Sequence, residues 1–241
     1  MNAFKKLVLI VFLLTVIIME ISSNTIIHKH YQILSQIRQT QAYNVIDTIS
    51  NDALVLKLTK KAEEIDILST FSHANILKVI EHFSINEDTP TSMCYIAPRY
   101  DMDLFEFITK YSTIEDSIKK IAKLILNGIK YIHSRGYSHG SIMLEHIYLS
   151  ITCNGPAVCI GGFGKCHKVD LDDNEDIFGF GTVLYQLFSQ NTIKIGVIDE
   201  LLISEEAKDL LKKCLSTNPK SRISIDNALN HKWFSTSLDD V

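Results

Sequence analysis

The stretch from Tyr131 to Leu149, YIHSRGYSHGSIMLEHIYL, decides the fold. It starts where a predicted long amphipathic helix ends, because apolar residues recur before it at helical spacing. These residues are Ile118, Ile121, Ala122, Ile125, Ile129 and Ile132. Downstream, the segment from Asp176 to Phe188 is apolar on nearly every face, which predicts a buried central helix. Ser204 precedes two glutamates and predicts the cap of a further helix, and a final helix is expected before Trp233.

The half of the chain before this stretch has a different pattern. Short runs rich in β-branched and aromatic residues, separated by polar turns, predict strands at 31–37, 43–49 and 53–58. A helix is expected over Lys60 to Phe71, and further strands over Ile76 to Phe83 and Ser92 to Ala97. Strands first and helices later are typical of a two-part α+β protein.

The quoted stretch resembles the catalytic loop of protein kinases, whose pattern is H-R-D-L-x-x-x-N. His139 is kept in this alignment, and Gly140 stands in place of Arg. Ser141 replaces the catalytic Asp, and His146 replaces the Asn that binds magnesium. Downstream, Gly162-Phe163-Gly164 resembles D-F-G with its metal-binding Asp changed to Gly.

Other segments resemble the same family in the family's own order. The glycine positions of the phosphate-binding loop are held by Arg38, Thr40 and Tyr43. Lys57 matches the lysine of the third strand, and Glu64 matches the glutamate that pairs with it. Asp176 matches the start of the central helix, and Arg222 matches a structural arginine near the chain end; the matches together extend from Tyr31 to Phe234. Agreement of this many segments favours the family more than any single motif does.

The resemblance implies a bilobal, protein-kinase-like α+β fold over residues 24–241. A small β-rich N-lobe is expected at about 30–97 and a larger helical C-lobe at about 103–235. Only Lys165 to Glu175 separate Gly164 from Asp176, and no A-P-E motif is present. Arg222 therefore lacks its usual glutamate and is expected to pair elsewhere or face solvent.

These substitutions predict a loss of the phosphoryl-transfer activity of the family. Magnesium is a hard cation that prefers oxygen ligands, whereas Gly162 has no side chain and His146 offers an imidazole. Ser141 is no base near neutral pH, and loss of general base catalysis costs roughly 10²–10⁴-fold. We therefore expect no catalytic residue, no metal site and no cofactor, with Ser141, His146 and Gly162 as degenerate equivalents.

Lys57 and Glu64 are interpreted as vestigial nucleotide-binding residues. Their closeness in sequence indicates a shortened regulatory helix, so whether they form an ion pair stays open, and so does weak, metal-independent binding of ATP. The resulting hypothesis is a catalytically inactive serine/threonine kinase homologue, a pseudokinase. It would be secreted and act by protein binding or scaffolding, and it would not be an enzyme. The alternative is a divergent active serine/threonine kinase with residual ATP binding.

The N-terminal segment predicts that the protein enters the secretory route. Lys5 and Lys6 precede an apolar run from Leu7 to Ile18, and polar residues follow. This pattern is typical of a secretory signal peptide over residues 1–23. The run is shorter than the roughly 20 residues that span a bilayer comfortably. The alternative is an uncleaved membrane anchor through residues 7–19.

Composition narrows the classes of partner. The 241 residues are 46% hydrophobic and 22% charged, as in a globular protein, with a net charge of −4 and no block of like charges. Nucleic acid is therefore not an expected partner, and a membrane is one only if the N-terminal segment is uncleaved. Five cysteines without framework spacing do not indicate a disulfide scaffold. We expect a protein partner, such as an active kinase or a host factor.

Overall fold

The computed structural model describes residues 25–38, 40–84, 93–153, 155–169, 174–191 and 197–235. The predicted signal peptide and the alternative anchor at residues 7–19 lie outside these residues. Among the described residues, no helix combines the length and apolar character that spanning a bilayer requires. The chain divides into two compact units. One runs up to Ile65 and includes Val79–Arg99, and the other contains Asp66–Lys78 and the chain from Tyr100 onward.

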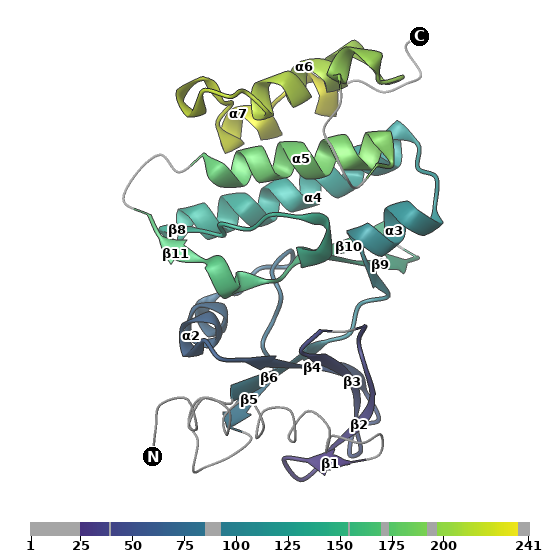
Figure 1. Cartoon of the computed structure of the whole chain (residues 1–241), viewed down its shortest axis with the longest axis vertical. Coiled ribbons are helices and arrows are strands. Elements are labelled where there is room, and N and C mark those ends of the chain that lie inside the picture. Colours follow the sequence, from purple (N-terminus) through teal and green to yellow (C-terminus); the bar gives the residue numbers. More distant parts are fainter. Residues whose placement is uncertain are drawn as a thin grey trace, which may run out of the picture. The chain divides into compact units, whose positions relative to one another are not determined.

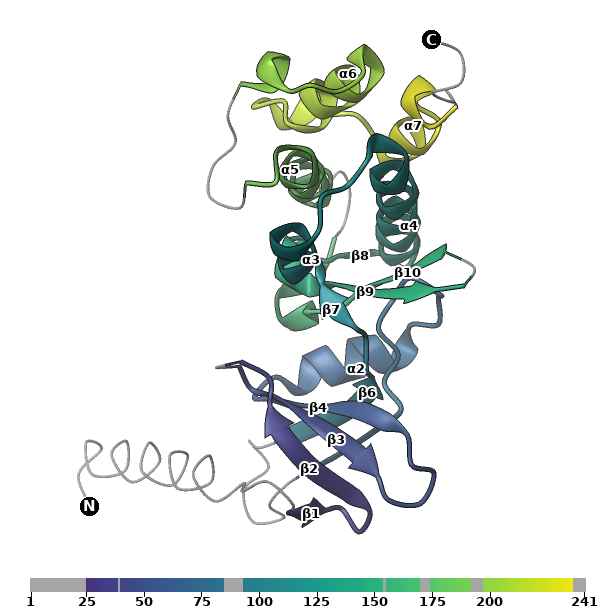
Figure 2. The same ribbon diagram turned by 90° about the vertical axis from the view of Figure 1, so that its right-hand side faces the viewer.

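The first unit is built on a six-stranded sheet, in the order β1-β2-β3-β4-β6-β5. Figure 2 shows β2, β3 and β4 side by side in this sheet. Neighbouring strands are antiparallel throughout. Successive side chains alternate between the two faces of each strand, and the apolar residues of the buried face form a core that includes Ile33, Val45 and Leu56. The strands are β1 (Ile26–Ile27), β2 (Tyr31–Gln36), β3 (Ala42–Asp47), β4 (Ala53–Thr59), β5 (Glu81–Ser84) and β6 (Met93–Pro98).

A glutamate side chain links strands from opposite ends of this sheet. Glu81 on β5 accepts a hydrogen bond from the Tyr31 hydroxyl on β2 at 2.7 Å, and its other oxygen lies 3.1 Å from His28 Nε2. The ring of His28 stacks on Phe83 with 4.0 Å between centroids. The hydrogen bond from Tyr31 holds the pKa of Glu81 below its ordinary value, against the effect of burial. The sheet is therefore curled, because its two edge regions are close enough to bond.

The second unit is mainly helical. Its longest helix, α4 (Glu115–Ser134), lies beside α5 (Glu175–Ser189) (Figure 1). The other face of α4 packs against β10, which forms a hairpin with β9. The remaining elements of this unit are β7 (Met102–Asp103), α3 (Leu104–Lys110), β8 (Tyr137–Ser138), β9 (Ile147–Thr152), β10 (Gly155–Ile160), β11 (His167–Lys168), α6 (Glu205–Cys214), α7 (Ile225–Leu229) and five 3₁₀ turns among the described residues.

One helix runs from the first unit into the second. Helix α2 (Ala62–Thr70) begins three residues after β4 ends, so the chain reverses at once between strand and helix. Two acidic residues, Glu63 and Glu64, occupy its first turn, where the positive end of the helix dipole favours them. This tight connection brings the start of α2 back beside β4.

The predicted elements agree with the structure at most places. The expected strands at 31–37, 43–49 and 53–58 and the helix over Lys60–Phe71 are confirmed within two residues. The Ser204 cap is confirmed too, since its hydroxyl accepts a hydrogen bond from the Ala207 amide at 3.2 Å. A strand-rich unit and a helical unit with the expected order of elements confirm the α+β, kinase-like fold class.

The strand expected over Ile76–Phe83 is wrong in its first half. Only Glu81–Ser84 forms a strand of the sheet. Ile76 makes an isolated parallel bridge to Ile160, and the Leu77 amide donates to the Ile160 carbonyl at 2.8 Å. Ile76 and Leu77 are buried, so their apolar character reflects packing in the helical unit. Apolar runs of this length do not distinguish the two situations.

Candidate functional site

The ion pair left open by the sequence is formed in the first unit. Lys57 Nζ on β4 lies 2.7 Å from Glu64 Oε1 in the first turn of α2. Thr59 donates to the other carboxylate oxygen at 3.0 Å, and the Tyr95 hydroxyl donates to Oε1 at 3.2 Å. Because the connection between β4 and α2 is short, the first turn of α2 lies beside β4, and Glu64 reaches Lys57.

Because Glu64 is buried, its negative charge depends on the groups that surround it. Glu64 is only 4% exposed, and a carboxylate removed from water needs a cation and hydrogen-bond donors to stay charged. Lys57, Thr59 and Tyr95 supply them. The pair in turn fixes the position of the Lys57 ammonium group, which also lies 5.7 Å from the centre of the Tyr95 ring. A fixed lysine at the end of a strand presents a point charge to which a phosphate can bind.

The hairpin between β2 and β3 carries the residues at the expected glycine positions. Arg38 has a left-handed backbone with φ of 51°, a conformation that favours glycine. The Thr40 hydroxyl donates to the Ile37 carbonyl at 2.5 Å, and Gln36 Nε2 donates to the Thr40 carbonyl at 2.6 Å. Tyr43 is buried in the sheet core, where burial raises the pKa of its phenol. Hydrogen bonds from side chains of the hairpin thus hold its turn, and Tyr43 is a core residue of the sheet.

In the second unit, Asp176 organises the loop that carries the quoted stretch. Its Oδ2 accepts the His139 amide at 2.7 Å and the Ser138 hydroxyl at 3.1 Å, and its Oδ1 accepts the Gly140 amide at 2.9 Å. His133 Nε2 lies 2.8 Å from Oδ2. Burial alone would raise the pKa of Asp176, yet the hydrogen bonds from His133 and from the His139 amide outweigh it and hold the pKa below its ordinary value. The loop is therefore fixed by a charged acceptor.

His139 is a structural residue of this loop. It is fully buried, and its Nε2 lies 2.8 Å from the Gly161 carbonyl, so this nitrogen carries the proton. Its Nδ1 accepts the Ser141 amide at 3.2 Å, and its ring packs edge-on against Phe163 at 4.7 Å. His139 thus connects the loop at 138–141 to the segment at 161–163.

The structure brings together the three positions where the family's chemistry is replaced. His146 Nδ1 lies 2.8 Å from the Ser141 carbonyl, so the loop fixes this ring. Gly162 has a left-handed backbone with φ of 75°, and a Cβ atom there would lie 2.4 Å from the His146 ring. The two substitutions are therefore sterically coupled, because the histidine ring fills the space that a side chain at position 162 needs.

The residues present do not fit magnesium. Its ligands in proteins are oxygen atoms, whereas His146 brings an imidazole and Gly162 brings no side chain. Among the described residues, no three His, Cys, Asp or Glu side chains are grouped so that they could hold a metal ion. We therefore derive no reaction step through a metal.

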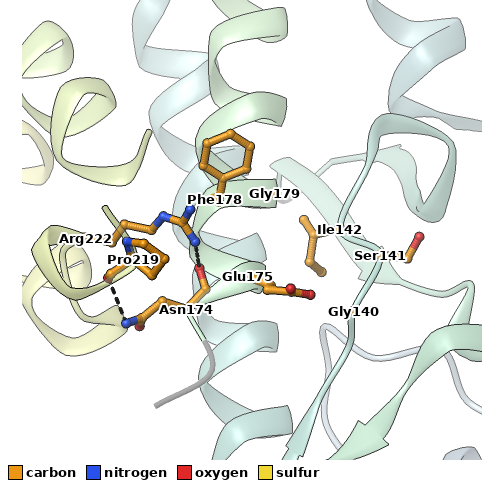
Figure 3. A pocket seen from close by; sticks show the side chains of 9 residues that line it. All are labelled: Gly140, Ser141, Ile142, Asn174, Glu175, Phe178, Gly179, Pro219 and Arg222. Atoms are coloured by element: carbon orange, nitrogen blue, oxygen red, sulfur yellow. Dashed lines mark hydrogen bonds between the residues drawn. The ribbon is translucent and has the colours of Figure 1, made fainter. Parts of the chain in front are cut away.

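A cavity of about 500 Å³ lies in the second unit beside Ser141 (Figure 3). One wall is the loop at Gly140–Ile142, and the other is formed by the start of α5 and by Pro219 and Arg222. Arg222 has found partners other than a carboxylate, as the missing A-P-E motif led us to expect. Its Nε donates to the Ser216 carbonyl at 2.9 Å, and its Nη1 donates to the Asn174 carbonyl at 3.1 Å.

Sequence reasoning missed three supporting residues. Thr59 lies two positions after Lys57 along a strand, so it points to the same face, and this spacing could have identified it. Tyr95 is paired with Lys57 across β4 and β6, which requires the strand register. His133 lies near the end of the helix that precedes the loop, and its ring supports Asp176, which a helical pattern does not reveal.

The comparison with known families agrees with this geometry. The protein kinase domain family matches residues 32–179. The chain is 26% identical to a probable serine/threonine-protein kinase of Encephalitozoon cuniculi, over 86% of this chain and 44% of that protein. It is 29% identical to the serine/threonine-protein kinase cds1 of Schizosaccharomyces pombe, over 72% of this chain and 47% of that protein. It is 24% identical to the serine/threonine-protein kinase RAD53 of Saccharomyces cerevisiae, over 83% of this chain and 31% of that protein.

The chain spans less than half the length of each of these relatives. All three are named serine/threonine-protein kinases, which are enzymes, so the expectation that this chain is not an enzyme is wrong. That expectation gave full weight to the side chains replaced at Ser141, His146 and Gly162 and too little to the fold that is kept around them. The match over residues 32–179 and these relatives show that the chain belongs to the protein kinase domain family.

Proposed function

We propose that the chain is a divergent serine/threonine protein kinase that binds a nucleoside triphosphate and transfers its terminal phosphoryl group slowly to a protein hydroxyl. The observation that supports this best is the 2.7 Å ion pair between Lys57 and Glu64. A buried glutamate held by three donors is a costly arrangement for a residue without a role. Its effect is to keep one ammonium group fixed, and that group can neutralise phosphate charge.

Slow transfer is consistent with the chemistry of the loop. The transition state of phosphoryl transfer is loose, so most of the catalysis comes from positioning and charge neutralisation. In the transfer, the hydroxyl oxygen of the substrate forms a bond to the γ-phosphorus as the bond to the bridging oxygen of the leaving diphosphate breaks. Ser141 stands where the family has its base, so the hydroxyl proton passes to water. The loss of a base slows such a reaction by roughly 10²–10⁴-fold without stopping it.

Because Lys57 matches the third-strand lysine of the family, we expect its ammonium group to contact the nucleotide phosphates. No metal takes part in this proposal. The nucleotide is expected to bind without magnesium, because neither His146 nor Gly162 offers the oxygen ligand that would hold the ion. The steric coupling of these two residues adds to this expectation. Restoring an aspartate at position 162 alone would force its side chain against the His146 ring.

Replacing Lys57 is expected to remove most nucleotide binding. We predict that Lys57→Met weakens ATP binding by about 10- to 100-fold, because a hydrogen bond between charged groups contributes about 1.5–3 kcal/mol. The measurement is the shift of the thermal unfolding midpoint on adding ATP with EDTA, taken relative to the same variant without ATP. Each variant is its own reference, so destabilisation of the fold by the unpaired Glu64 does not enter the comparison.

The matched control is Lys60→Met, which removes an exposed lysine three residues further along the chain. It should leave the ATP-induced shift unchanged. Equal shifts in the wild type and in Lys57→Met would contradict the proposed role of Lys57. The absence of any shift in the wild type over a wide range of ATP concentrations would contradict nucleotide binding itself.

Restoring the carboxylate at position 141 tests the account of the slow rate. We predict that Ser141→Asp raises the rate of phosphoryl transfer to a generic protein substrate by roughly 10²-fold or more, since a base becomes available. The measurement is the incorporation of radioactive phosphate from γ-labelled ATP, with Ser141→Ala as a control that should match the wild type. A rate for Ser141→Asp no higher than that of Ser141→Ala would show that a missing base does not limit the reaction.

We also propose that the chain enters the secretory route. The support is the sequence pattern of residues 1–23, two lysines followed by an apolar run. Expression of a C-terminally tagged full-length chain in a eukaryotic cell is expected to give a product in the medium whose first residue follows position 23. A product that stays in the membrane fraction with residues 7–19 intact would support the anchored alternative instead. A cytosolic product with an intact N-terminus would contradict both.

A further inference from the structure

The two ring nitrogens of His146 differ in their surroundings. Nδ1 lies 2.8 Å from the Ser141 carbonyl, which is an acceptor only, so Nδ1 carries a proton and donates it. Nε2 makes no hydrogen bond to any residue that the structure describes. Within those residues, Thr113 Oγ1 is the one buried side-chain oxygen or nitrogen that lacks a partner. Nε2 of His146 is therefore open to solvent.

The neighbours of His146 fix the direction in which Nε2 points. The ring atoms nearest to a Cβ atom built on Gly162 are Cδ2, Cγ and Nδ1, at 2.4, 2.4 and 2.8 Å. The backbone is held as well, since the His146 carbonyl accepts the Gly161 amide at 2.8 Å and its amide donates to the Met143 carbonyl at 3.0 Å. Nε2 lies across the imidazole from Nδ1, so it points away from the Ser141 carbonyl. A group held in this way loses little freedom when it binds a ligand.

Protonation changes what Nε2 can bind. Histidine is the side chain whose charge changes between about pH 5 and 8. In the neutral ring of His146, Nε2 accepts a hydrogen bond, whereas in the protonated ring it donates one and the ring is positively charged. The titratable group closest to this ring among its described contacts is His139, at 6.1 Å between ring centroids, and both nitrogens of His139 are bonded to backbone groups. Glu145, the neighbour in sequence, is exposed. Protonation thus turns Nε2 from an acceptor into a charged donor.

The position of His146 in the loop indicates which anion such a donor meets. His146 stands where the resemblance has the asparagine that binds magnesium, and in the family the metal neutralises charge on the nucleotide phosphates. The nucleotide proposed above binds without magnesium, so positive charge has to come from side chains. Lys57 supplies one such charge from the first unit. A protonated His146 supplies another from the second unit.

We propose that the protonated ring of His146 donates a hydrogen bond from Nε2 to a phosphate oxygen of the bound nucleoside triphosphate and so replaces the charge of the metal. The inference rests on the function proposed above and adds a second phosphate-binding residue to Lys57. The step makes and breaks no covalent bond other than the N–H bond, whose proton comes from the solvent. Nucleotide binding therefore takes up a proton and becomes stronger as the pH falls.

The test compares the affinity of the full-length wild type and of His146→Asn for ATP, in EDTA, at pH 6 and pH 8. Affinities come from the unfolding midpoint as ATP is added, relative to the same protein at the same pH without ATP. Asparagine keeps an N–H donor for the Ser141 carbonyl. The advantage of the wild type over His146→Asn should be about 10-fold larger at pH 6 than at pH 8, because only the protonated ring makes a charged hydrogen bond. ATP itself gains a proton in this range, and comparing the two proteins at each pH removes that effect.

The matched control is His82→Asn, which removes an exposed histidine of β5 and should keep the pH dependence of the wild type. A second measurement needs no folded variant. In the wild type with ¹⁵N-labelled histidine, ATP added at pH 7 should move one ring Nε2 resonance toward the protonated position.

The outcomes separate this inference from the function on which it rests. If ATP shifts the midpoint of the wild type but His146→Asn has the same pH dependence, or if ATP protonates no histidine ring, the role of His146 is overturned and nucleotide binding stands. If His82→Asn loses the pH dependence as His146→Asn does, the effect is not specific to His146 and the inference is overturned as well. If ATP shifts the midpoint at neither pH, both proposals are overturned.

Discussion

The shape of the candidate site depends on one buried carboxylate. Asp176 lies in the first turn of α5, is 1% exposed, and accepts hydrogen bonds from the Ser138 hydroxyl and from the backbone amides of His139 and Gly140. A buried charge is retained only if it is fully bonded, so the loop and the helix fix each other. None of the groups that react in the kinase family takes part in these hydrogen bonds. The bonds are therefore present although Ser141, in the same loop, replaces the family's catalytic aspartate.

In the loop at 138–141 and the segment at 161–163, the divergence of the chain therefore concerns side chains. The His146 ring fills the space beside Gly162 that a side chain at position 162 would need. Phe163 remains packed against His139 and Phe71. In the first unit, Lys57 and Glu64 are held together by Thr59 and Tyr95. A framework that keeps these contacts and alters its ligands is consistent with the slow, metal-free transfer proposed above.

The sequence predicted the framework better than it predicted the function. Helical periodicity before Tyr131 and alternation in β2, β3 and β4 come from local patterns, and these were confirmed. The strand expected at 76–83 was wrong because Ile76 and Leu77 are apolar for packing against the β10 region, which a local pattern does not reveal. The sequence alone does not decide whether Lys57 and Glu64 pair, because the tight β4–α2 connection and the β4–β6 register that adds Tyr95 are tertiary features. The wrong inference of a non-enzyme came from reading replaced side chains in isolation.

The central claim is that Asp176 fixes the loop, and amide hydrogen exchange tests it most directly. In the full-length protein the amides of His139 and Gly140 should exchange slowly, and Asp176→Asn should speed both by about 10- to 100-fold, since each loses a bond to a charged acceptor. The Ile160 amide, bonded to the Asn75 carbonyl, should change far less. Equal exchange of the two loop amides in both proteins, or an equal acceleration at Ile160, would contradict the account.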